Sequence, residues 1–483
     1  MICAVSFIPS GSCRRDPLRY ELSPEEAEAL RLAAEAKEEF ADDSRAEALE
    51  TVENEGEENE DIEEDDAEGI DHDTSELPPE LRMDEYDDQD ETMLGAAFKG
   101  DNIEDPLVGD DDEGSDQEEN RIESGDMLII SARTDDDQSL LELNCYDPEN
   151  GNMWVHHDIA LAAFPLAISF MDCAPRTIDP GSAGAFVAVG TFKPGIEIWN
   201  LDVIDALEPS AVLGGEIDGG MSAANYGPQQ QPSSGGKKRK KKGKKKKAPS
   251  APVMVPDSHT DAVLALDWNR HQRQMLASAS ADTTVKMWDV TSQQCFHTCR
   301  HHGVDKVAAV RWHSTEASVL ATGAYDKSVA VLDVRSCEKV TRFAMTADLE
   351  DIAWDPHNPA LLVAAAEDGM VRCFDVRNTA QPLWSLQAHR EEAASTVCFA
   401  PHIPGLVATA STDKTVKLWR TTGEGAVPTL VSSKEMAVGK LFSMGWSTEA
   451  SQPWTLACGG SKGQLAIWEA DEQAGLAESF QQS

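Results

Sequence analysis

Four residues between positions 295 and 302 are of the types that bind zinc: Cys295, Cys299, His301 and His302. Thiolate and imidazole groups at close spacing are the usual ligands of this metal. These four residues, however, fall in a predicted outer strand and in the loop after it, and the repeat described below accounts for that position. We therefore predict no metal site and no cofactor.

The pentapeptide GGSKG, residues 459–463, formally matches the G-x-S-x-G pattern of a catalytic serine. In enzymes with that pattern, the serine stands between a strand and a helix. Here the motif lies at a strand-to-strand turn inside a repeat, and the chain contains neither a Walker loop nor a dinucleotide-binding fingerprint. The sequence therefore predicts a binding protein, with no catalytic residue and no small-molecule substrate.

The densest charge in the chain is KKRKKKGKKKK, in which ten of eleven residues are basic. These residues are Lys237, Lys238, Arg239, Lys240, Lys241, Lys242, Lys244, Lys245, Lys246 and Lys247. Such a run indicates nuclear or nucleolar targeting, with or without contact to RNA or DNA phosphates; a solvated linker is the alternative. Because no aromatic residues are interleaved for base stacking, any nucleic-acid binding should be sequence-independent and salt-sensitive.

Acidic residues dominate the chain from about residue 41 to residue 125, in runs such as ENEDIEEDDAEGIDHD and GDDDEGSDQEEN. Few large apolar residues are present to offset the entropy lost on folding, so we predict disorder. The whole chain has a net charge of -46 and a pI near 4.4, which favours basic partners such as histones or basic ribosomal proteins. Shielding of the lysine run within the chain and solubility alone are the alternatives.

Two hydroxyl residues, Ser115 and Thr134, have acidic residues just downstream, as acidophilic kinases prefer. Such sites also arise by chance in an acidic tract. Both are candidate phosphorylation sites, and the pattern predicts a phosphoprotein.

Membrane insertion and a disulfide framework are both disfavoured by the sequence. No run of about 18 apolar residues occurs, so we expect no membrane span. The ten cysteines are scattered without a C-x-x-C pair, a pattern typical of reduced, mostly buried thiols in a nuclear or cytosolic protein.

A repeat occupies the second half of the chain. Aromatic residues recur at spacings of 44, 42, 45 and 47 residues, at Trp268, Trp312, Trp354, Phe399 and Trp446. Each is followed by a strand of small residues, such as MLASASAD, and then by a strand such as TVKMWD. A period in the low forties with several short strands per unit is the signature of propeller blades.

These residues resemble the WD40 repeat family. The family's structural hydrogen-bond network is matched by His259, Ser278 or Ser280, Asp282 and Trp288, and again by His389, Asp413 and Trp419. In the partly matching repeats the turn aspartates are Asp326 and Asp368. Leu332 and Phe374 replace tryptophan and Lys462 replaces a turn aspartate, so those blades should depend more on packing.

The apolar segment CAVSFIPSG stands before an acidic tract, and the number of blades accounts for this position. Residues 165–202 supply a sixth blade, and residues 126–147 with NMWVHHD supply three strands of another. CAVSFIPSG resembles the inner strand TVCFAPHIPG, with Phe7 in the place of Phe399. We therefore predict an all-β, seven-bladed WD40 β-propeller whose first inner strand is separated from its blade by an insertion, because loop-closure entropy grows only slowly with length.

The predicted organisation has five parts. Residues 1–10 form the inner strand of blade 1, and residues 11–125 form the acidic insertion, with a short helix at about 24–40 followed by disorder. Residues 126–214 complete blades 1 and 2, residues 215–256 form a disordered linker rich in Gly, Pro, Gln and Lys, and residues 257–479 form blades 3 to 7. Capping by Ser23, Pro24 and Glu26 predicts the helix. The WD40 connectivity implies that the insertion and the linker leave opposite faces.

Two further motifs resemble the WDxR signature by which some WD40 proteins dock on adaptors of cullin-type ubiquitin ligases. They are LDVR, which ends at Arg335, and FDVR, which ends at Arg377. An arginine in solvent after a strand is the alternative. The resemblance raises the possibility of a ubiquitin-ligase substrate receptor.

A narrower resemblance extends over nearly the whole chain. YDPENGNMWVHHDIALAAFPLAISFMD, VAVGTFKPGIEIWNLDVIDALEPSAVLGG and HTDAVLALDWNRHQRQMLASASAD are similar to the periodic tryptophan protein 1 family. That resemblance implies a nuclear and nucleolar scaffold in ribosome biogenesis, acting in ribosomal RNA gene transcription or chromatin and in pre-ribosomal RNA processing. Its implied partners are ribosome assembly factors and basic proteins, with non-specific contact to RNA or ribosomal DNA chromatin. A histone-binding chaperone and a ubiquitin-ligase substrate receptor are the alternatives.

Overall fold

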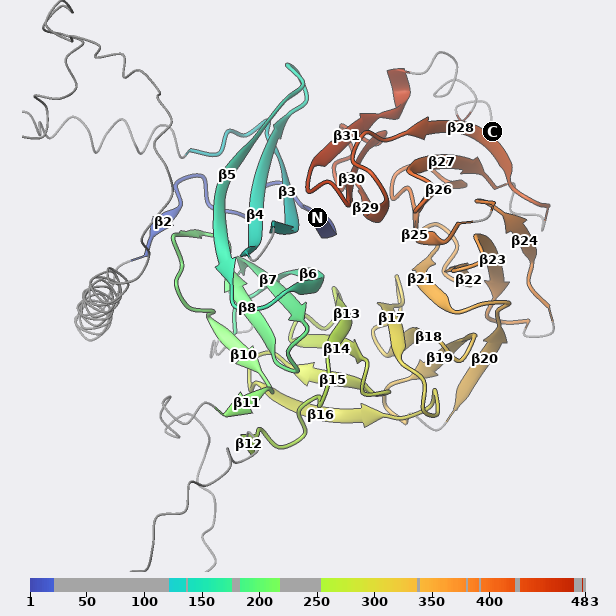
Figure 1. Cartoon of the computed structure of the whole chain (residues 1–483), viewed down its shortest axis with the longest axis horizontal. Coiled ribbons are helices and arrows are strands. Elements are labelled where there is room, and N and C mark those ends of the chain that lie inside the picture. The colour runs from blue at the N-terminus through green and yellow to red at the C-terminus, as the bar shows by residue number, and fades with distance from the viewer. Residues whose placement is uncertain are drawn as a thin grey trace, which may run out of the picture. The chain divides into compact units, whose positions relative to one another are not determined.

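The computed structural model describes residues 1–20, 121–135, 138–175, 183–217, 253–336, 339–378, 381–390, 392–421, 426–472 and 480. Within these ranges, seven β-sheets follow one another around a ring (Figure 1). This arrangement confirms the predicted all-β, seven-bladed propeller. The predicted helix at 24–40, the acidic tract and the lysine run all lie outside the described residues.

Blade 1 joins two parts of the chain that are far apart in sequence. Its strands are β1 (Ile2–Ile8), β3 (Met127–Asp135), β4 (Gln138–Asp147) and β5 (Asn152–Leu161). β1 is the inner strand and pairs antiparallel with β3, with Ile8 opposite Leu128 (Figure 1). The acidic insertion therefore begins where β1 ends.

Blades 2 to 6 each have four antiparallel strands, ordered from the axis outward. Blade 2 contains β6 (Pro165–Cys173), β7 (Ala183–Thr191), β8 (Ile196–Asn200) and β10 (Ala211–Leu213). Blade 3 contains β13 (Val263–Trp268), β14 (Met275–Ser280), β15 (Val285–Asp289) and β16 (Gln294–Cys299). Blade 4 contains β17 (Val307–Trp312), β18 (Val319–Ala324), β19 (Ser328–Asp333) and β20 (Val340–Ala344). Blade 5 contains β21 (Leu349–Trp354), β22 (Leu361–Ala366), β23 (Met370–Asp375) and β24 (Trp384–Gln387). Blade 6 contains β25 (Ala394–Phe399), β26 (Leu406–Ser411), β27 (Thr415–Arg420) and β28 (Thr429–Glu435).

Small residues dominate the second strand of each blade because both of its faces are covered. Every residue of β14, β22 and β26 is buried, so these strands consist of small and apolar residues without alternation of exposed polar ones. The inner-strand aromatics, such as Trp268 and Trp312, are also buried and belong to clusters that join neighbouring blades. The fold is therefore stabilised mainly by packing between blades.

Blade 7 has three strands in the described residues: β29 (Leu441–Trp446), β30 (Thr455–Gly460) and β31 (Leu465–Glu469), followed by the short helix η6 (Ala470–Glu472). The ring closes where this blade packs on blade 1. The Val5 amide donates a hydrogen bond to Ser443 Oγ at 2.9 Å, and the Tyr146 hydroxyl donates one to Glu469 Oε1 at 2.5 Å. The Ser10 amide also donates to Glu449 Oε1 at 2.8 Å, so closure depends on side-chain packing together with hydrogen bonds of this kind.

Short backbone ladders lie at the ends of the segments predicted as the insertion, 11–125, and as the linker, 215–256. β2 (Leu18–Arg19) pairs with β9 (Val203–Ile204), and β11 (Glu216–Ile217) pairs with β12 (Val253–Met254). Short backbone ladders of this kind carry no hydrophobic periodicity, so the sequence pattern could not reveal them. Because successive strands of a blade alternate in direction, β1 and β10 end at opposite faces of the ring.

Candidate functional site

Blade 3 contains a buried chain of polar side chains that ties its second and third strands to the loop before its inner strand. His259 Nδ1 lies 2.9 Å from Asp282 Oδ2, and His259 Nε2 lies 2.7 Å from Ser278 Oγ. The Trp288 indole donates to the same hydroxyl at 2.8 Å. Of the two serines considered from the sequence, Ser278 therefore joins this network, whereas the Ser280 hydroxyl donates to the backbone oxygen of Asp261.

Blade 6 repeats this geometry with threonine in place of serine. His389 Nδ1 lies 2.7 Å from Asp413 Oδ2, and His389 Nε2 lies 3.0 Å from Thr409 Oγ1. The Trp419 indole donates to Thr409 Oγ1 at 2.9 Å. The structure thus brings together the residues that the sequence assigned to the networks of blades 3 and 6.

Blade 4 has a third network, in which the structure gives Asp326 a histidine partner that the sequence analysis missed. His302 Nδ1 lies 2.9 Å from Asp326 Oδ2, and His302 Nε2 lies 2.8 Å from Thr322 Oγ1. Leu332 replaces the tryptophan, and the Thr322 hydroxyl lies 3.4 Å from the backbone oxygen of Ala330. The spacing of the two residues in the sequence could have revealed this pair, because His302 precedes Asp326 by 24 residues, as His389 precedes Asp413.

Burial sets the charge state of these networks. It lowers the pKa of His259, His302 and His389, and the aspartate that faces each ring opposes this shift. Burial alone would raise the pKa of Asp282, but hydrogen bonds from His259 and Thr284 lower it instead. A neutral imidazole beside an ionised carboxylate satisfies both groups, so each network ties the strands of its own blade to the loop before the inner strand.

Asp368 occupies the corresponding turn in blade 5 with fewer contacts. Its side chain is exposed and accepts a hydrogen bond from the Met370 amide at 3.1 Å. Within the described ranges it has no histidine partner. Blade 5 accordingly depends on apolar packing, with Phe374 and Trp384 both buried.

The four zinc-type residues are separated by the fold into other roles. His302 belongs to the network of blade 4, and His301 Nε2 lies 2.8 Å from the Thr322 hydroxyl. Cys299 is disulfide-bonded, so the expectation of reduced thiols is wrong for this residue, whereas eight other cysteines in the described ranges are free. No group of three or more His, Cys, Asp or Glu residues in those ranges is arranged to hold a metal ion.

The serine of GGSKG has a structural contact. Ser461 Oγ accepts a hydrogen bond from the Lys440 amide at 3.1 Å, and the motif begins at the end of β30 and continues into the turn before β31. The turn thereby fastens the start of β29 to the end of β30.

Charged side chains line the hollow around the propeller axis, a cavity of about 240 Å³ bordered by inner strands. Asp351 Oδ1 accepts from Arg311 at 3.3 Å, and Asp351 Oδ2 accepts from the Thr396 hydroxyl at 2.8 Å. Asp267 Oδ2 accepts from the Trp312 amide at 2.6 Å. These contacts link blades 3 to 6 around the axis, and the sequence did not reveal them because each links residues about 45 positions apart.

An acidic group lies beside this hollow on blade 5. Burial, together with the carboxylates of Glu367, Asp351 and Asp348, raises the pKa of Glu350 to about 7. Glu350 lines the cavity itself. Concentrated negative charge at this position favours a cationic ligand over an anionic one.

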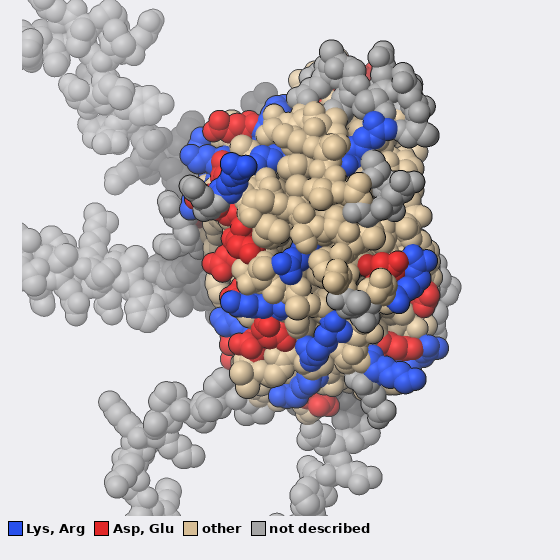
Figure 2. All heavy atoms as spheres, turned by 90° about the vertical axis from the view of Figure 1, so that its right-hand side faces the viewer, with Lys and Arg blue, Asp and Glu red and all other residues tan. Residues whose placement is uncertain are grey.

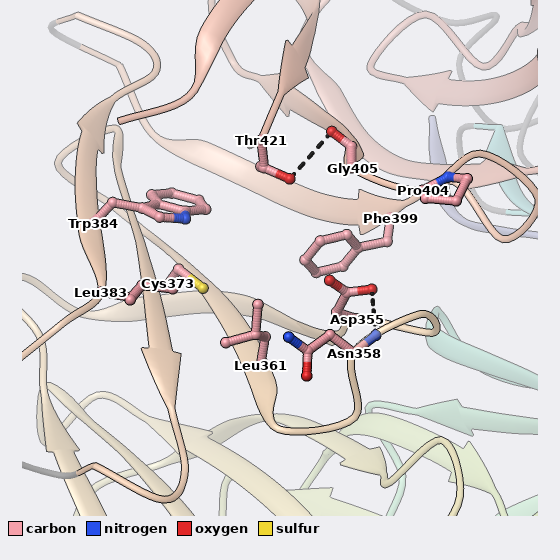
Figure 3. Close-up of a pocket in the computed structure, with 10 residues that line it drawn as sticks. All are labelled: Asp355, Asn358, Leu361, Cys373, Leu383, Trp384, Phe399, Pro404, Gly405 and Thr421. Atoms are coloured by element: carbon pink, nitrogen blue, oxygen red, sulfur yellow. Dashed lines mark hydrogen bonds between the residues drawn. The ribbon is translucent and has the colours of Figure 1, made fainter. Parts of the chain in front are cut away.

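A second cavity of about 240 Å³ lies between blades 5 and 6 (Figure 3). Trp384 and Cys373 lie on one side, Phe399 on the other and Leu361 between them, and all four are buried (Figure 3). The polar rim is ordered by its own bonds: Asp355 accepts from the Asn358 amide, and Thr421 donates to the Gly405 oxygen at 3.2 Å. The cavity has the composition that accepts an apolar side chain of a protein partner.

The two WDxR-like arginines lie at the surface. Arg335 pairs with Asp333 and Arg377 pairs with Asp375, in each case through guanidinium contacts below 3 Å. Their side chains are 75% and 69% exposed, so each has donors left for a partner. On the side of the molecule shown in Figure 2, basic and acidic residues are interspersed where the structure describes them.

The remaining predicted sites are mostly outside the described ranges. Ser115 and the run Lys237 to Lys247 fall there. Thr134 lies on β3 and is partly buried. Its backbone oxygen accepts a hydrogen bond from the Met1 amino group, and its amide donates one to the Met1 backbone oxygen. No helix in the described part of the chain has the length and apolarity required to cross a bilayer.

Comparison with known sequences agrees with this geometry. The family described as WD domain, G-beta repeat matches residues 250–289, 293–333 and 380–420. Those matches contain the third strands of blades 3, 4 and 6, the blades with a histidine–aspartate network. The chain is therefore a WD-repeat β-propeller protein, a class whose surfaces bind other proteins.

Relatives match over almost the entire length. An uncharacterized WD repeat-containing protein of Schizosaccharomyces pombe is 36% identical over 100% of this chain and 91% of its own length. Periodic tryptophan protein 1 of Saccharomyces cerevisiae is 30% identical over 99% of this chain and 90% of its own, and its Drosophila melanogaster homolog is 30% identical over 95% and 91%. This chain belongs to the periodic tryptophan protein 1 family.

Proposed function

We propose that this protein is a nuclear and nucleolar scaffold in ribosome biogenesis, which acts in ribosomal RNA gene transcription or chromatin and in pre-ribosomal RNA processing. It binds ribosome assembly factors and basic proteins. The observation that carries this proposal is its similarity to periodic tryptophan protein 1 over almost the whole chain.

The structure supports a scaffold through the kind of surface it offers. Networks and interblade packing hold the blades rigidly, so loops on two faces and the rim are presented at fixed positions. The acidic group at Glu350 and the apolar cavity of blades 5 and 6 accept different side chains, one cationic and one apolar. Several partners can therefore bind one molecule at once.

Affinity purification from nuclear extract tests the proposal. The tagged full chain is purified in two halves, one treated with nuclease, and both protein and RNA are identified. We expect assembly factors and pre-ribosomal RNA in the untreated half, with the assembly factors retained after nuclease because they dock on the propeller. Recovery of histones alone, or of a cullin adaptor alone, would overturn the proposal.

Two variants separate the alternatives within the same experiment. Deleting residues 42–125 should abolish histone recovery if the protein is a histone chaperone, but should leave propeller-bound assembly factors in place. Charge reversal at Arg335 and Arg377 should remove a cullin adaptor if one binds through these exposed residues. We expect neither change to remove assembly factors.

A further inference from the structure

The outer edge of blade 7 is open in the described residues. Blades 1 to 6 each have four strands, whereas β31 is the last strand of a three-stranded sheet and pairs only with β30 (Figure 1). An unpaired strand edge presents a row of backbone donors and acceptors to any extended chain. Natural proteins usually protect such an edge, so this one requires an explanation.

The pairing register shows which backbone groups are free to accept a new strand. The Ala470 amide donates to the Trp454 oxygen, and the same register places Trp468 opposite Leu456 and Ala466 opposite Cys458. Hydrogen-bonded and non-hydrogen-bonded pairs alternate along an antiparallel ladder. The amides and carbonyls of Leu465, Ile467 and Glu469 therefore point away from β30, toward the open edge.

Side-chain burial indicates that the edge lacks a cover that the other blades have. The positions equivalent to Leu465 and Ile467 are Val285 and Met287 in blade 3, and Val416 and Leu418 in blade 6. Those four side chains are at most 1% exposed. Leu465 and Ile467 face blade 1 as well but are both only partly buried.

Blade 1 supplies an apolar wall on the far side of this opening. Tyr146, which bonds to Glu469 of β31, pairs across the ladder with Met153, and Asn144 pairs with Val155. Cross-strand partners share one face of a sheet, so Met153 and Val155 face blade 7. They are 39% and 49% exposed, which is unusual for two apolar residues on an interior-facing side.

We propose that β31 binds an extended segment of a partner protein, which pairs antiparallel with it and completes blade 7 as its fourth strand. The segment needs about five residues to match β31. Apolar side chains at two alternating positions would cover Leu465 and Ile467 and contact Met153. This inference stands independently of the assembly in which the protein functions.

A lysine on the other side of the edge adds a preference for charge. Lys434 of blade 6 lies over the Trp468 ring, 5.5 Å from its centre, and its side chain is exposed. The partner residue opposite Trp468 would lie beside this ammonium group. A segment that alternates apolar residues with a carboxylate at that position fits best.

The one described residue beyond Glu472, Phe480, lies away from this edge. Phe480 packs against Trp454 and lies 5.0 Å from the Arg420 guanidinium, which places it at blade 6 and the start of β30. Seven residues separate Glu472 from Phe480. A strand advances about 3.3 Å per residue, so covering all five residues of β31 and coming back would need about nine residues.

Hydrogen exchange on a full-length fusion tests the proposal. A peptide copying residues 339–346, which contain the outer strand β20 of blade 4, is joined through a flexible linker after Ser483, so that its effective concentration is in the millimolar range. In β20, Phe343 pairs with Val329, the equivalent of Leu465. The matched control fusion carries lysine at the peptide copy of Phe343.

The proposal predicts that amide exchange at Leu465 and Ile467 is slowed roughly tenfold or more by the fused strand and unchanged by the control fusion. Equal exchange in the two fusions would overturn it. Slow exchange in the unfused protein would also overturn it: if independent of concentration, residues of the same chain cover the edge, and if lost on dilution, a second copy does.

A backbone variant provides the second measurement. Ile467→Pro removes an outward-facing amide, and Ser433→Pro removes the equivalent outward amide on β28, the edge of a complete blade. We expect Ile467→Pro alone to abolish protection by the fused strand. If Ile467→Pro unfolds the protein, as its thermal melting would show, the lysine control fusion still decides the outcome.

Discussion

Single residues stabilise this propeller at the places where a buried polar chain joins a loop to two strands. Asp282 is 6% exposed and accepts bonds from His259, Thr284 and two backbone amides. Removing its carboxylate deprives the buried His259 and Thr284 of this partner. We expect Asp282→Ala to lower the free energy of unfolding by about 3 kcal/mol, measured by urea denaturation.

Asp368→Ala is the matched control, because this aspartate occupies the same turn in blade 5 but is exposed, and within the described residues its carboxylate bonds only to its own turn. Its loss should change stability by no more than about 0.5 kcal/mol. Equal effects of the two substitutions would show that the histidine contact in blade 3 contributes nothing.

The half-buried carboxyl of Glu350 should make stability depend on pH. Its pKa is raised to about 7, first by burial and then by neighbouring carboxylates, so the folded state binds a proton that the unfolded state has lost. Stability should therefore fall as the pH rises from about 4.5 through 7.

Glu350→Gln should raise the free energy of unfolding by about 1 to 2 kcal/mol at pH 8 and by much less at pH 4, with solvent screening allowed for. Thermal melting at the two pH values measures this difference. A gain of the same size at both would contradict the raised pKa.

Most residues of the buried polar networks could be predicted from the sequence. Histidine and aspartate 23 or 24 residues apart mark the networks of blades 3 and 6, and a separation of 24 residues marks His302 and Asp326 in retrospect. The contacts of Asp267, Arg311 and Asp351 could not be predicted, because they join different blades around the axis and leave no local pattern.

At the level of strands and turns, the connection between second and third strands has the same left-handed residue in several blades. Thr283, Lys327 and Lys414 have φ between 61° and 71°, and blade 5 has Gly369 with φ 72°. Side chains are thus tolerated at this conformation. Gly369 differs because a Cβ atom there would lie 2.1 Å from the His389 carbonyl oxygen.

We therefore predict that Gly369→Ala lowers the free energy of unfolding by about 2 to 4 kcal/mol, from backbone strain together with the clash. Gly11→Ala is the control: its φ is 74°, but the new Cβ would meet nothing within 4 Å, so it should cost only about 1 kcal/mol. Chemical denaturation of both variants measures the difference, and similar losses would contradict the role of the contact.

The strand pattern itself was predictable, because small-residue strands and regularly spaced aromatics recur with a single period. The ladders β2–β9 and β11–β12 were not, since two-residue strands contain no periodicity. The open edge of β31 could not be predicted either, because the sequence of β31 resembles the third strand of a complete blade.

At the scale of the whole molecule, the first blade depends on a strand that precedes a long insertion. β1 is the inner strand of blade 1 and also packs on blade 7, where Val5 bonds to Ser443. Its position allows the insertion to be removed without cutting a blade, since the Ile122 amide already bonds to the Arg15 oxygen at 3.0 Å.

Replacing residues 21–119 by a short Gly/Ser linker should therefore leave the melting temperature of the propeller within about 2 °C. Deleting residues 1–8 should abolish cooperative unfolding, because blade 1 loses its inner strand and the ring cannot close. Circular dichroism melts compare the two deletions. Unfolding of the first, or a stable second, would contradict this view of the closure.

A role in ribosome biogenesis can be measured through ribosome production in cells. Cells in which this protein is rapidly depleted are pulse-labelled with a ribosomal RNA precursor, and the full-length chain is reintroduced as the control. The account predicts reduced synthesis or delayed processing of pre-ribosomal RNA within one cell cycle, reversed by the reintroduced chain. Normal synthesis and processing kinetics after complete depletion would contradict a role in ribosome biogenesis.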